Sequence, residues 1–501
     1  MTPFGYSVYD LLRRATSQFG ARNAVHHEGG VLTYQELMTR TDSLAAGLAG
    51  AGIRHGDRIC VLAQNNLEYF ELYLASAKIG AVMYPINWRL TAEEVGHVVT
   101  RAEPVAFVYD ALCADVTQEV RATHSEVEQW IAIGGAAGAT DFASLYSDGQ
   151  VAQDITNPDD LFVAISTAAV DVIPRGAALS HTNVTVSSAQ TVAAMGLNET
   201  DAHLCCLPLF HITALGFALA VLHAGGCNII LPKFDANEVV RLSDEHGGSL
   251  IGSFPPMLGS VLDAAKEAAS ALPNLRHVAG LEMPDTIGRL QSETGATFYA
   301  GFGQSETSGF VTIQKFNDKP GAAGRAGLMA DVAIHDDDDN PVAVGEVGEI
   351  VVRGPMVMKE YFGQPDVTEY TFRNGWHHTG DLGKIDEEGY VFYAGRKPEK
   401  ELIKPGGENV YPAEVEAVID EMDAVTGVCV FGVPDEKWGE AVKAVVEADA
   451  STTSAQDVID YVGSRIGRFK RPQIVEFTDA LPRKDDGSVD RERVKVDWSS
   501  A

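Results

Sequence analysis

Short apolar runs rich in β-branched residues alternate with longer stretches of helical hydrophobic period through roughly the first 300 residues. The runs at residues 58–62, 105–109, 161–165 and 227–231 each have the length of a buried strand. Strands that alternate with helices in this way form parallel sheets covered by helices. The pattern therefore predicts an α/β fold whose large N-terminal domain is built of parallel α/β layers.

The pattern changes twice in the last third of the chain. From about residue 324 to residue 394, closely spaced strands and turns replace the helical stretches, which predicts a β subdomain. Charged and turn-forming residues then displace the apolar period at residues 396–407, as is typical of a domain boundary. A helix at residues 412–421 and a strand at residues 428–433 indicate a small α+β domain after it. The predicted domains are residues 1–395 and residues 396–501.

The composition and net charge limit the kinds of partner that this protein is expected to bind. Of 501 residues, 45% are hydrophobic and 22% are charged, which is typical of a globular protein of more than one domain. Asp and Glu number 70 against 38 Lys and Arg, so the net charge is -32. That charge repels nucleic acid and anionic membranes, and no basic stripe offsets it, so we expect neither as a partner.

The cysteines and the N-terminus predict a cytoplasmic protein. The six cysteines lack CxxC spacing and lie among apolar segments, which is typical of free buried thiols and not of a zinc site. No basic stretch followed by an apolar one opens the chain, so no signal peptide is expected. Residues 212–231 carry no formal charge over a length that could cross a bilayer. Gly225 and Gly226 divide them, so we expect a buried helix and a buried strand, and no membrane span.

Six motifs follow one another along nearly the whole chain. They are PINWRLT at residues 85–91, PLFH at 208–211, GFGQSET at 301–307, GEIVVRGP at 348–355, GWHHTGDLG at 375–383 and GGENVYPAEVE at 406–416. Together they resemble the adenylate-forming superfamily of acyl-CoA synthetases, aryl-CoA ligases and luciferases. The resemblance implies an enzyme that joins a carboxylic acid to coenzyme A through an acyl-adenylate, converting ATP to AMP and pyrophosphate with Mg²⁺. It also implies that the C-terminal domain is a mobile lid.

The resemblance assigns roles in the N-terminal domain. Glu306 resembles the magnesium-binding glutamate, Asp381 the aspartate that accepts both ribose hydroxyls, and Arg396 the arginine that contacts the nucleotide. His211 resembles a histidine that lines the acyl pocket. Four neighbours are also expected in catalysis or nucleotide binding: Ser305, Phe302, Gln304 and Arg175. Outside the motifs, Glu306 would be a surface carboxylate, Arg396 a solvated linker charge and His211 a satisfied core histidine.

In the lid, the resemblance places Gly406, Gly407 and Glu408 along the pantetheine tunnel, because glycines permit close approach of a chain. The phosphates of coenzyme A would need local cations. The candidates are Lys397, Lys400, Lys404, Arg468, Lys470 and Arg471. Solvated surface charge is an equal alternative for each of them.

The phosphate loop departs from the family pattern. Residues 166–173 read STAAVDVI, so Ala169 and Val172 stand where the family has glycines, and Val170 and Asp171 where it has threonines. Glycines let backbone N–H groups converge on an anion, whereas valines restrict the backbone and Asp171 adds a negative charge. We therefore expect weakened pyrophosphate binding.

Two further departures lie elsewhere. Ser488 stands where the family has a lysine that neutralises charge between the carboxylate and the α-phosphate, and serine carries no charge. Lys484, four residues upstream, is the cation that would replace it if the loop shifts register. Residues 277–282 read HVAGLE, where the family usually has Gly-Gly-Ala against the adenine.

Three functions are compatible with this sequence. The first is an ATP-dependent acyl-CoA or aryl-CoA ligase, which the retained motifs favour. The second is an enzyme of the same fold with lost or weak adenylation that acts on a CoA thioester or an acyl-adenylate by hydrolysis, transfer or lysis. The third is a non-catalytic protein that binds a nucleotide or acyl-CoA. Residues 254–257 and 301–304 with His211 predict a pocket for a modest aryl or medium aliphatic acid. A homodimer is an open alternative to a monomer.

Overall fold

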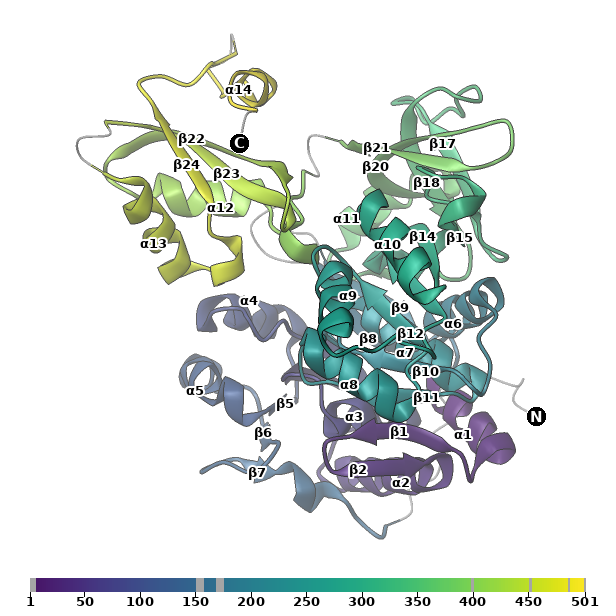
Figure 1. Cartoon of the computed structure of the whole chain (residues 1–501). Coiled ribbons are helices and arrows are strands. Elements are labelled where there is room, and N and C mark those ends of the chain that lie inside the picture. Colours follow the sequence, from purple (N-terminus) through teal and green to yellow (C-terminus); the bar gives the residue numbers. More distant parts are fainter. Residues whose placement is uncertain are drawn as a thin grey trace.

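The computed structural model describes residues 6–149, 157–167, 175–397, 401–449, 453–484 and 487–499. These residues form a large body, a β subdomain and a C-terminal unit, seen at the bottom, upper right and upper left of Figure 1. Two sheets run through the body. The nine-stranded sheet has the order β16 (Arg325–Ala326), β15 (Gly309–Lys315), β14 (Thr297–Gln304), β13 (His277–Gly280), β12 (Leu250–Ser253), β10 (Ala202–Cys205), β11 (Cys227–Ile230), β1 (Asn23–His27) and β2 (Gly30–Thr33). The eight-stranded sheet has the order β19 (Glu360–Tyr361), β9 (Arg175–Ser180), β8 (Leu161–Thr167), β4 (Val82–Pro85), β3 (Arg58–Leu62), β5 (Ala106–Tyr109), β6 (Gln129–Ala132) and β7 (Thr140–Asp141).

The predicted α/β layers are confirmed. The apolar runs predicted as strands form β3, β5, β8 and β11, each within two residues of its predicted ends. The inner strands of both sheets pair in parallel, as β10 does with β11 and β3 with β4. The antiparallel pairs β14–β15 and β8–β9 lie toward one end of each sheet, and both lead into the candidate site.

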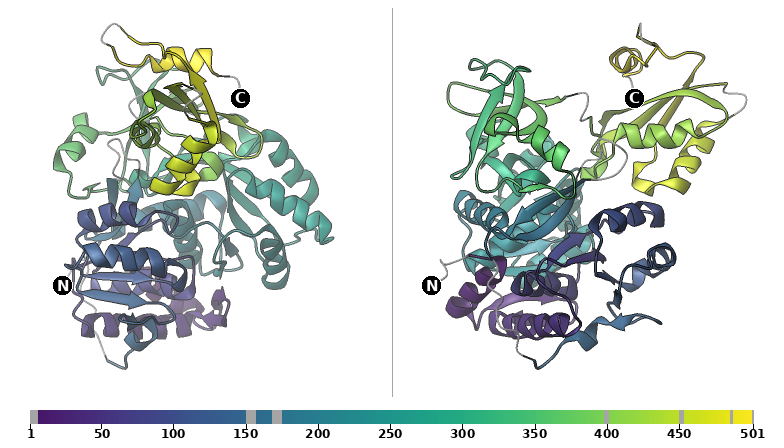
Figure 2. Two further views of the ribbon diagram at one scale, coloured as in Figure 1. Left: turned by 90° about the vertical axis from the view of Figure 1, so that its left-hand side faces the viewer. Right: turned by 180° about the vertical axis from the view of Figure 1, so that it is seen from behind.

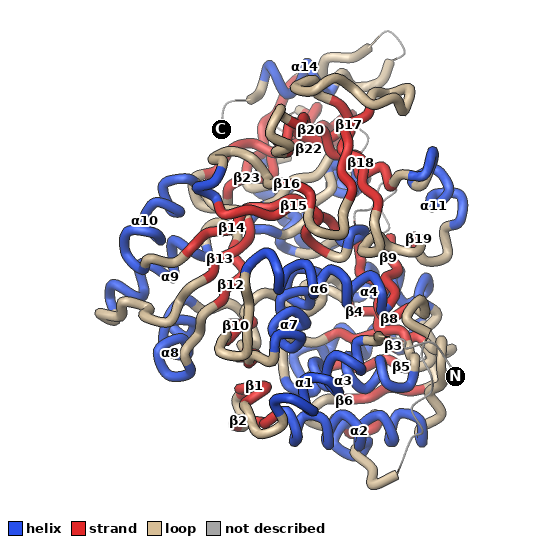
Figure 3. Tube along the Cα trace, turned by 90° about the vertical axis from the view of Figure 1, so that its right-hand side faces the viewer, coloured by secondary structure: helices blue, strands red, loops and turns tan. Residues whose placement is uncertain are grey.

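Helices pack against both sheets, as the tube in Figure 3 shows. They are α1 (Val8–Phe19), α2 (Tyr34–Gly50), α3 (Leu67–Ile79), α4 (Ala92–Ala102), α5 (Ala114–Thr123), α6 (His181–Met195), α7 (Ile212–Ala224), α8 (Ala236–His246), α9 (Met257–Glu267) and α10 (Pro284–Thr294). In α3 every residue except Glu68 is buried, because other helices and strands surround it on all sides.

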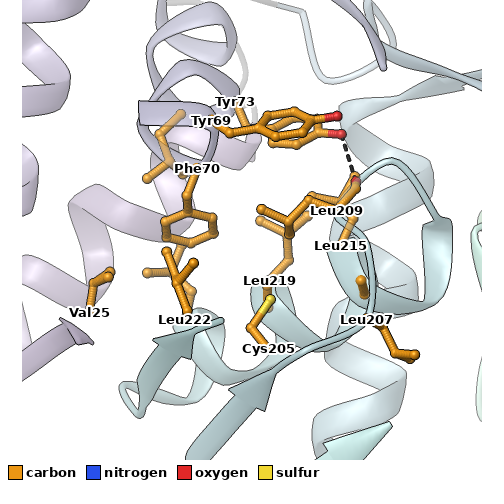
Figure 4. Close-up of a cluster of buried hydrophobic side chains, with 14 of the residues drawn as sticks. Val25, Tyr69, Phe70, Tyr73, Cys205, Leu207, Leu209, Leu215, Leu219 and Leu222 are labelled. Atoms are coloured by element: carbon orange, nitrogen blue, oxygen red, sulfur yellow. Dashed lines mark hydrogen bonds between the residues drawn. The ribbon is translucent and has the colours of Figure 1, made fainter. Parts of the chain in front are cut away.

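The main core includes the contact between α3 and α7. Figure 4 shows side chains of the two helices facing each other, with Phe70 close to Leu222. At one edge of this core the Tyr73 hydroxyl donates a hydrogen bond to the Leu209 carbonyl oxygen at 2.9 Å. The core therefore fixes the loop that leads into His211.

The uncharged segment at residues 212–231 is a helix followed by a strand, as predicted. Helix α7 ends at Gly225, whose φ of 84° is the left-handed conformation that glycine adopts without strain, and β11 begins two residues later. Among the described residues, none of the helices combines the length and the apolar character needed to span a bilayer.

The β subdomain and the C-terminal unit each have a sheet of their own. The first sheet has the order β17 (Asp331–His335), β18 (Gly348–Arg353), β20 (His377–Ile385) and β21 (Val391–Arg396), with α11 (Pro365–Thr371) beside it. The second has the order β22 (Val425–Asp435), β23 (Gly439–Ala448) and β24 (Ile474–Thr478), with α12 (Pro412–Asp420), α13 (Ala455–Arg465) and α14 (Arg491–Asp497). The predicted helix and strand of the C-terminal unit are α12 and the middle of β22.

The C-terminal unit packs its own hydrophobic core around β22, β23 and α12. It stands beyond α4 of the body, as the rear view in Figure 2 shows. Arg396 is the last residue of β21 and pairs with a strand of the β subdomain. The division into residues 1–395 and 396–501 stays a prediction, since strand pairing does not tell which segments move together.

Candidate functional site

Glu306 lies on the 3₁₀ turn Ser305–Thr307 that follows β14. The residue is only 7% exposed. Its Oε1 accepts hydrogen bonds from Thr167 Oγ1 at the end of β8 and from the Tyr361 hydroxyl on β19, both at 2.8 Å. Strands of both sheets thus hold one carboxylate in place, and the alternative of a surface carboxylate is wrong.

Tyr361 connects Glu306 to Arg175. Burial, and then the charge of Glu306, raises the pKa of Tyr361 well above its usual value, so the hydroxyl remains a donor. The Arg175 guanidinium carbon lies 5.3 Å from the centroid of the Tyr361 ring. Arg175 begins β9, directly after the phosphate loop. The altered loop positions lie outside the described residues: Ala169, Val170, Asp171 and Val172.

Asp381 and Arg396 face each other across β20 and β21. Asp381 is only 1% exposed, and Arg396 Nε lies 2.9 Å from its Oδ1. The Tyr393 hydroxyl donates to the same oxygen at 3.3 Å. The side chain of Arg396 is 17% exposed, so the alternative of a solvated linker charge is wrong.

Gln304 joins the turn of Glu306 to the turn of Asp381. Its Nε2 donates to Asp381 Oδ2 and, at 3.0 Å, to the Thr379 carbonyl oxygen. Ser305 lies between Gln304 and Glu306 and is the first residue of the turn. Two residues before Gln304, Phe302 stacks on Tyr393 with the ring centroids 6.5 Å apart. The structure therefore gathers the predicted nucleotide-side residues around one short segment, 302–306.

Glu408 crosses from the C-terminal unit to the body. Its carboxylate accepts a hydrogen bond from Arg89 Nη1 at 2.8 Å and one from Asn87 Nδ2 at 3.2 Å, and lies 3.8 Å from His211 Nε2. Burial opposes its ionisation, but the contacts with His211, Arg89 and Asn87 lower the pKa of Glu408. His211 is 30% exposed at the start of α7, so the alternative of a satisfied core histidine is wrong.

The two glycines before Glu408 pack tightly against aromatic rings. Gly406 and Gly407 have φ values of 60° and 86°, which favour glycine. A Cβ on Gly406 would lie 3.0 Å from the Trp438 ring, and one on Gly407 would lie 3.0 Å from Phe254. The segment 406–408 therefore enters the body beside the predicted acyl pocket.

Family models match most of the chain. The model described as AMP-binding enzyme matches residues 12–362, and the model of the AMP-binding enzyme C-terminal domain matches residues 414–487. The chain belongs to the AMP-binding enzyme family. The predicted superfamily is thereby confirmed.

Similar proteins cover this AMP-binding enzyme nearly end to end. The long-chain-fatty-acid–CoA ligase FadD13 of Mycobacterium tuberculosis is 33% identical over 94% of this chain and 93% of its own. Feruloyl-CoA synthase of an Amycolatopsis species is 33% identical over 93% of this chain and 94% of its own. The structure of a double mutant of o-succinylbenzoate CoA synthetase from Bacillus subtilis, bound with its product analogue OSB-NCoA, is 26% identical with a TM-score of 0.85, over 97% of this chain and 98% of its own.

Several cations predicted for the phosphates of coenzyme A have protein partners instead. Lys397 Nζ lies 3.1 Å from Asp337 and 3.0 Å from Glu349. Lys470 is buried between two glutamates. Lys404 is exposed by surface area. Desolvation and the nearby positive charge of Arg396 lower its pKa. Arg468 is exposed, Arg471 donates to the Arg468 carbonyl oxygen at 3.0 Å, and Lys400 lies outside the described residues.

Lys484 lies in a hairpin of the C-terminal unit. Its backbone N–H donates to the Ser488 carbonyl oxygen at 2.8 Å, and the neighbouring Arg483 pairs with Glu447 at 3.1 Å. This hairpin precedes α14, at the outer end of the C-terminal unit in Figure 1. No contact of the described residues joins Lys484 to Glu306. The predicted catalytic role of Lys484 would thus require a different placement of the C-terminal unit.

Sequence reasoning missed several residues that shape the site. Thr167 and Tyr361 hold Glu306, and Glu349 holds the turn before Asp381 by accepting from the Gly380 N–H at 2.8 Å. Asn87 and Arg89 lie inside the first motif, so that motif was the available signal. A cavity of about 290 Å³ opens beside this network. Its lining includes Arg175, Glu349, Arg373, His378, Gly380 and Lys397.

Glu349 should make the stability of the β subdomain depend on pH. Burial opposes its ionisation, but hydrogen bonds from His378, Lys397 and Gly380 lower its pKa from 4.5 to about 2. Because the folded pKa is the lower one, this stabilisation is complete above the unfolded pKa and is lost as the pH falls toward the folded value. Between about pH 5 and about pH 3.5 the free energy of unfolding should fall by ~1 kcal/mol through this group.

Urea unfolding at a series of pH values measures this loss. The Glu349→Gln protein should lack it, whereas the exposed Glu360→Gln control should keep it. Equal acid dependence in the wild type and in Glu349→Gln would rule the assignment out.

Proposed function

We propose that this AMP-binding enzyme is an acid–CoA ligase. A carboxylate oxygen of the acid would attack the α-phosphate of ATP and release pyrophosphate, and the thiol of coenzyme A would then attack the acyl carbon, release AMP and give up its proton. The observation that carries the proposal is that polar contacts join the motif segments on both the nucleotide side and the thiol side of the site. Gln304 bridges the Asp381 and Glu306 turns on the nucleotide side, and Glu408 reaches His211 from the C-terminal unit.

The nucleotide side suits ATP with a divalent cation. Asp381 would accept the ribose hydroxyls, and Arg396 would face the phosphate or ribose. The carboxylate of Glu306 and the hydroxyl of Thr167 are oxygen donors of the kind that Mg²⁺ prefers, with phosphate oxygens and water completing its shell. Bound Mg²⁺ would spread the charge of the phosphates. Arg175 supplies a fixed positive charge near the phosphate loop.

The side of the site that would receive the thiol of coenzyme A contains residues of both domains. Glu408 sits between Arg89 and His211, so the segment 406–408 would close against the predicted acyl pocket. The likeness to the o-succinylbenzoate CoA synthetase structure bound with its product analogue supports this placement, because it extends over 97% of this chain with a TM-score of 0.85. We infer that the present arrangement is the one for transfer to the thiol, with the hairpin of Lys484 and Ser488 turned away.

The acid is proposed to be an aryl or medium aliphatic one. FadD13 is named for long-chain fatty acids and the Amycolatopsis enzyme for ferulate, at equal identity to this chain, so the names do not decide between an aliphatic and an aryl acid. Phe254 and His211 give the pocket an aromatic wall with one polar group, which favours acids of moderate size. The cytoplasmic location and the homodimer stay predictions.

Pyrophosphate exchange with a panel of aryl and aliphatic acids tests the function. The wild type should exchange pyrophosphate with at least one acid and form the thioester when coenzyme A is added. In Ser488→Lys, exchange should rise by about tenfold or more, because a cation would then be available to the developing charge.

Other outcomes would change the assignment. Exchange in the variant alone would favour the enzyme with lost adenylation, which the sequence of the phosphate loop and Ser488 also favours. If neither protein exchanges, tight acyl-CoA binding without turnover in calorimetry would identify a binding protein.

A further inference from the structure

A buried three-charge cluster joins the C-terminal unit to the body. Lys470 Nζ lies 2.5 Å from Glu94 Oε1 and 2.5 Å from Glu414 Oε1. The three side chains are only 5%, 9% and 5% exposed, respectively. Glu94 belongs to α4 of the body, whereas Lys470 and Glu414 belong to the C-terminal unit. One of the two ion pairs therefore crosses between domains, and the other does not.

The carboxylate of Glu94 is held by the N-terminal cap of its own helix as well as by the C-terminal unit. Its Oε2 accepts hydrogen bonds from the backbone N–H of Thr91 at 2.7 Å and from the Thr91 hydroxyl at 2.9 Å, which form the capping box of α4. The same oxygen accepts the backbone N–H of Gly467 at 3.1 Å. The carboxylate thus presents one oxygen to a lysine and the other to a backbone donor of the other domain.

This contact and the contact of Glu408 lie on one short segment of the body. Glu408 bonds to Asn87 and Arg89, and Glu94 follows five residues after Arg89. A Cβ on Gly467 would lie 3.2 Å from the Arg89 carbonyl oxygen, so the backbones approach closely between the two contacts. One contact alone leaves the domain free to rotate about it, whereas a second contact restricts that rotation.

We propose that the Glu94–Lys470 pair is a positioning contact for thioester formation. It holds the C-terminal unit against α4 so that Glu408 reaches His211 and the segment 406–408 closes the acyl side. Of the three charges in the cluster, Glu94 belongs to the body, so a change at Glu94 removes the ion pair between the domains even though Lys470 keeps Glu414 as a partner. The inference rests on the proposed ligase function, since only the thiol step needs residues of both domains in this arrangement.

Two matched variants test the proposal. Glu94→Gln removes the charge that crosses the domains and keeps the capping box, because glutamine also caps at this position. Glu414→Gln removes the same charge from the same cluster within one domain and keeps the Glu94–Lys470 pair. In Glu94→Gln the rate of thioester formation should fall about tenfold or more, while pyrophosphate exchange stays at or above the wild-type rate. In Glu414→Gln both rates should stay near the wild-type values.

Amide hydrogen exchange of residues 466–470 gives a readout that does not depend on activity. These amides should exchange faster in Glu94→Gln, since the Gly467 N–H loses a charged acceptor, and should stay protected in Glu414→Gln. An equal fall of both half-reactions, unchanged exchange in Glu94→Gln, or the same effects in both variants would overturn the proposal. If the wild type forms neither adenylate nor thioester, the proposed function fails, and hydrogen exchange alone decides whether Glu94 holds the domain.

Discussion

The Glu306→Gln protein is expected to form acyl-adenylate about 10²- to 10³-fold more slowly than the wild type while keeping its fold. The amide has nearly the shape of the carboxylate, and its oxygen can still accept the hydrogen bonds from Thr167 and Tyr361. It carries no charge, so a divalent cation and the phosphates it neutralises lose their anionic anchor. Pyrophosphate exchange over a range of Mg²⁺ concentrations measures the effect, and higher Mg²⁺ should recover part of the rate.

Tyr361→Phe is the matched control for this change. It removes one of the two hydroxyl donors to Glu306 and leaves the charge in place, so exchange should fall by no more than about tenfold. Urea unfolding of both variants checks that the fold is retained. A Glu306→Gln protein with the exchange rate and Mg²⁺ dependence of the wild type would remove Glu306 from the proposed metal site.

The elements of the body follow from local pattern. Buried parallel strands are short, apolar and β-branched, and β3 and β11 carry that signal almost without interruption. The boundary between α7 and β11 was predictable because a glycine with a left-handed φ ends the helix. Strand order was not predictable in this way, since β10 pairs with both β11 and β12 through contacts that no local pattern encodes.

The residues expected to contact the nucleotide were predicted from motifs, whereas the residues that hold them in place by hydrogen bonds were not. Gln304, Glu306 and Asp381 stand in glycine-rich motifs, and the structure brings these motifs together. Tyr361 and Thr167 each contribute one hydroxyl to Glu306 from segments without any unusual composition. A single buried donor leaves no trace in spacing or charge, so only tertiary structure reveals it.

The lysines show the limit of charge as a signal. Lys397 and Lys470 stand in polar segments that read equally well as phosphate contacts or solvated surface. In the structure Lys397 pairs with Glu349, and Lys470 pairs with Glu94 from a segment more than three hundred residues earlier in the chain. The partner of a cation across such a separation depends on how two domains dock, which the local sequence does not specify.

The second large effect is expected on AMP binding when Asp381, the predicted ribose contact, is changed. Asp381→Ala should weaken AMP binding by about 2 kcal/mol, or roughly 30-fold, the scale of lost hydrogen bonds to a charged group. A carboxylate offers about four lone-pair sites, and Gln304, Tyr393 and Arg396 already use three of them. Both ribose hydroxyls can therefore bind only if one of these donors withdraws, and we expect that donor to be Arg396, the last residue of β21.

Calorimetric titration with AMP measures the change, and Tyr393→Phe serves as the control. That variant keeps the carboxylate of Asp381 and the aromatic ring that stacks on Phe302, so its AMP affinity should stay within about 0.5 to 1 kcal/mol of the wild type. Withdrawal of Arg396 would cost an ion pair in the wild type, and each single change already removes that cost, so Arg396→Ala combined with Asp381→Ala should weaken binding by more than the sum of the two single changes. Equal AMP affinity in Asp381→Ala and the wild type would show that the ribose lies elsewhere.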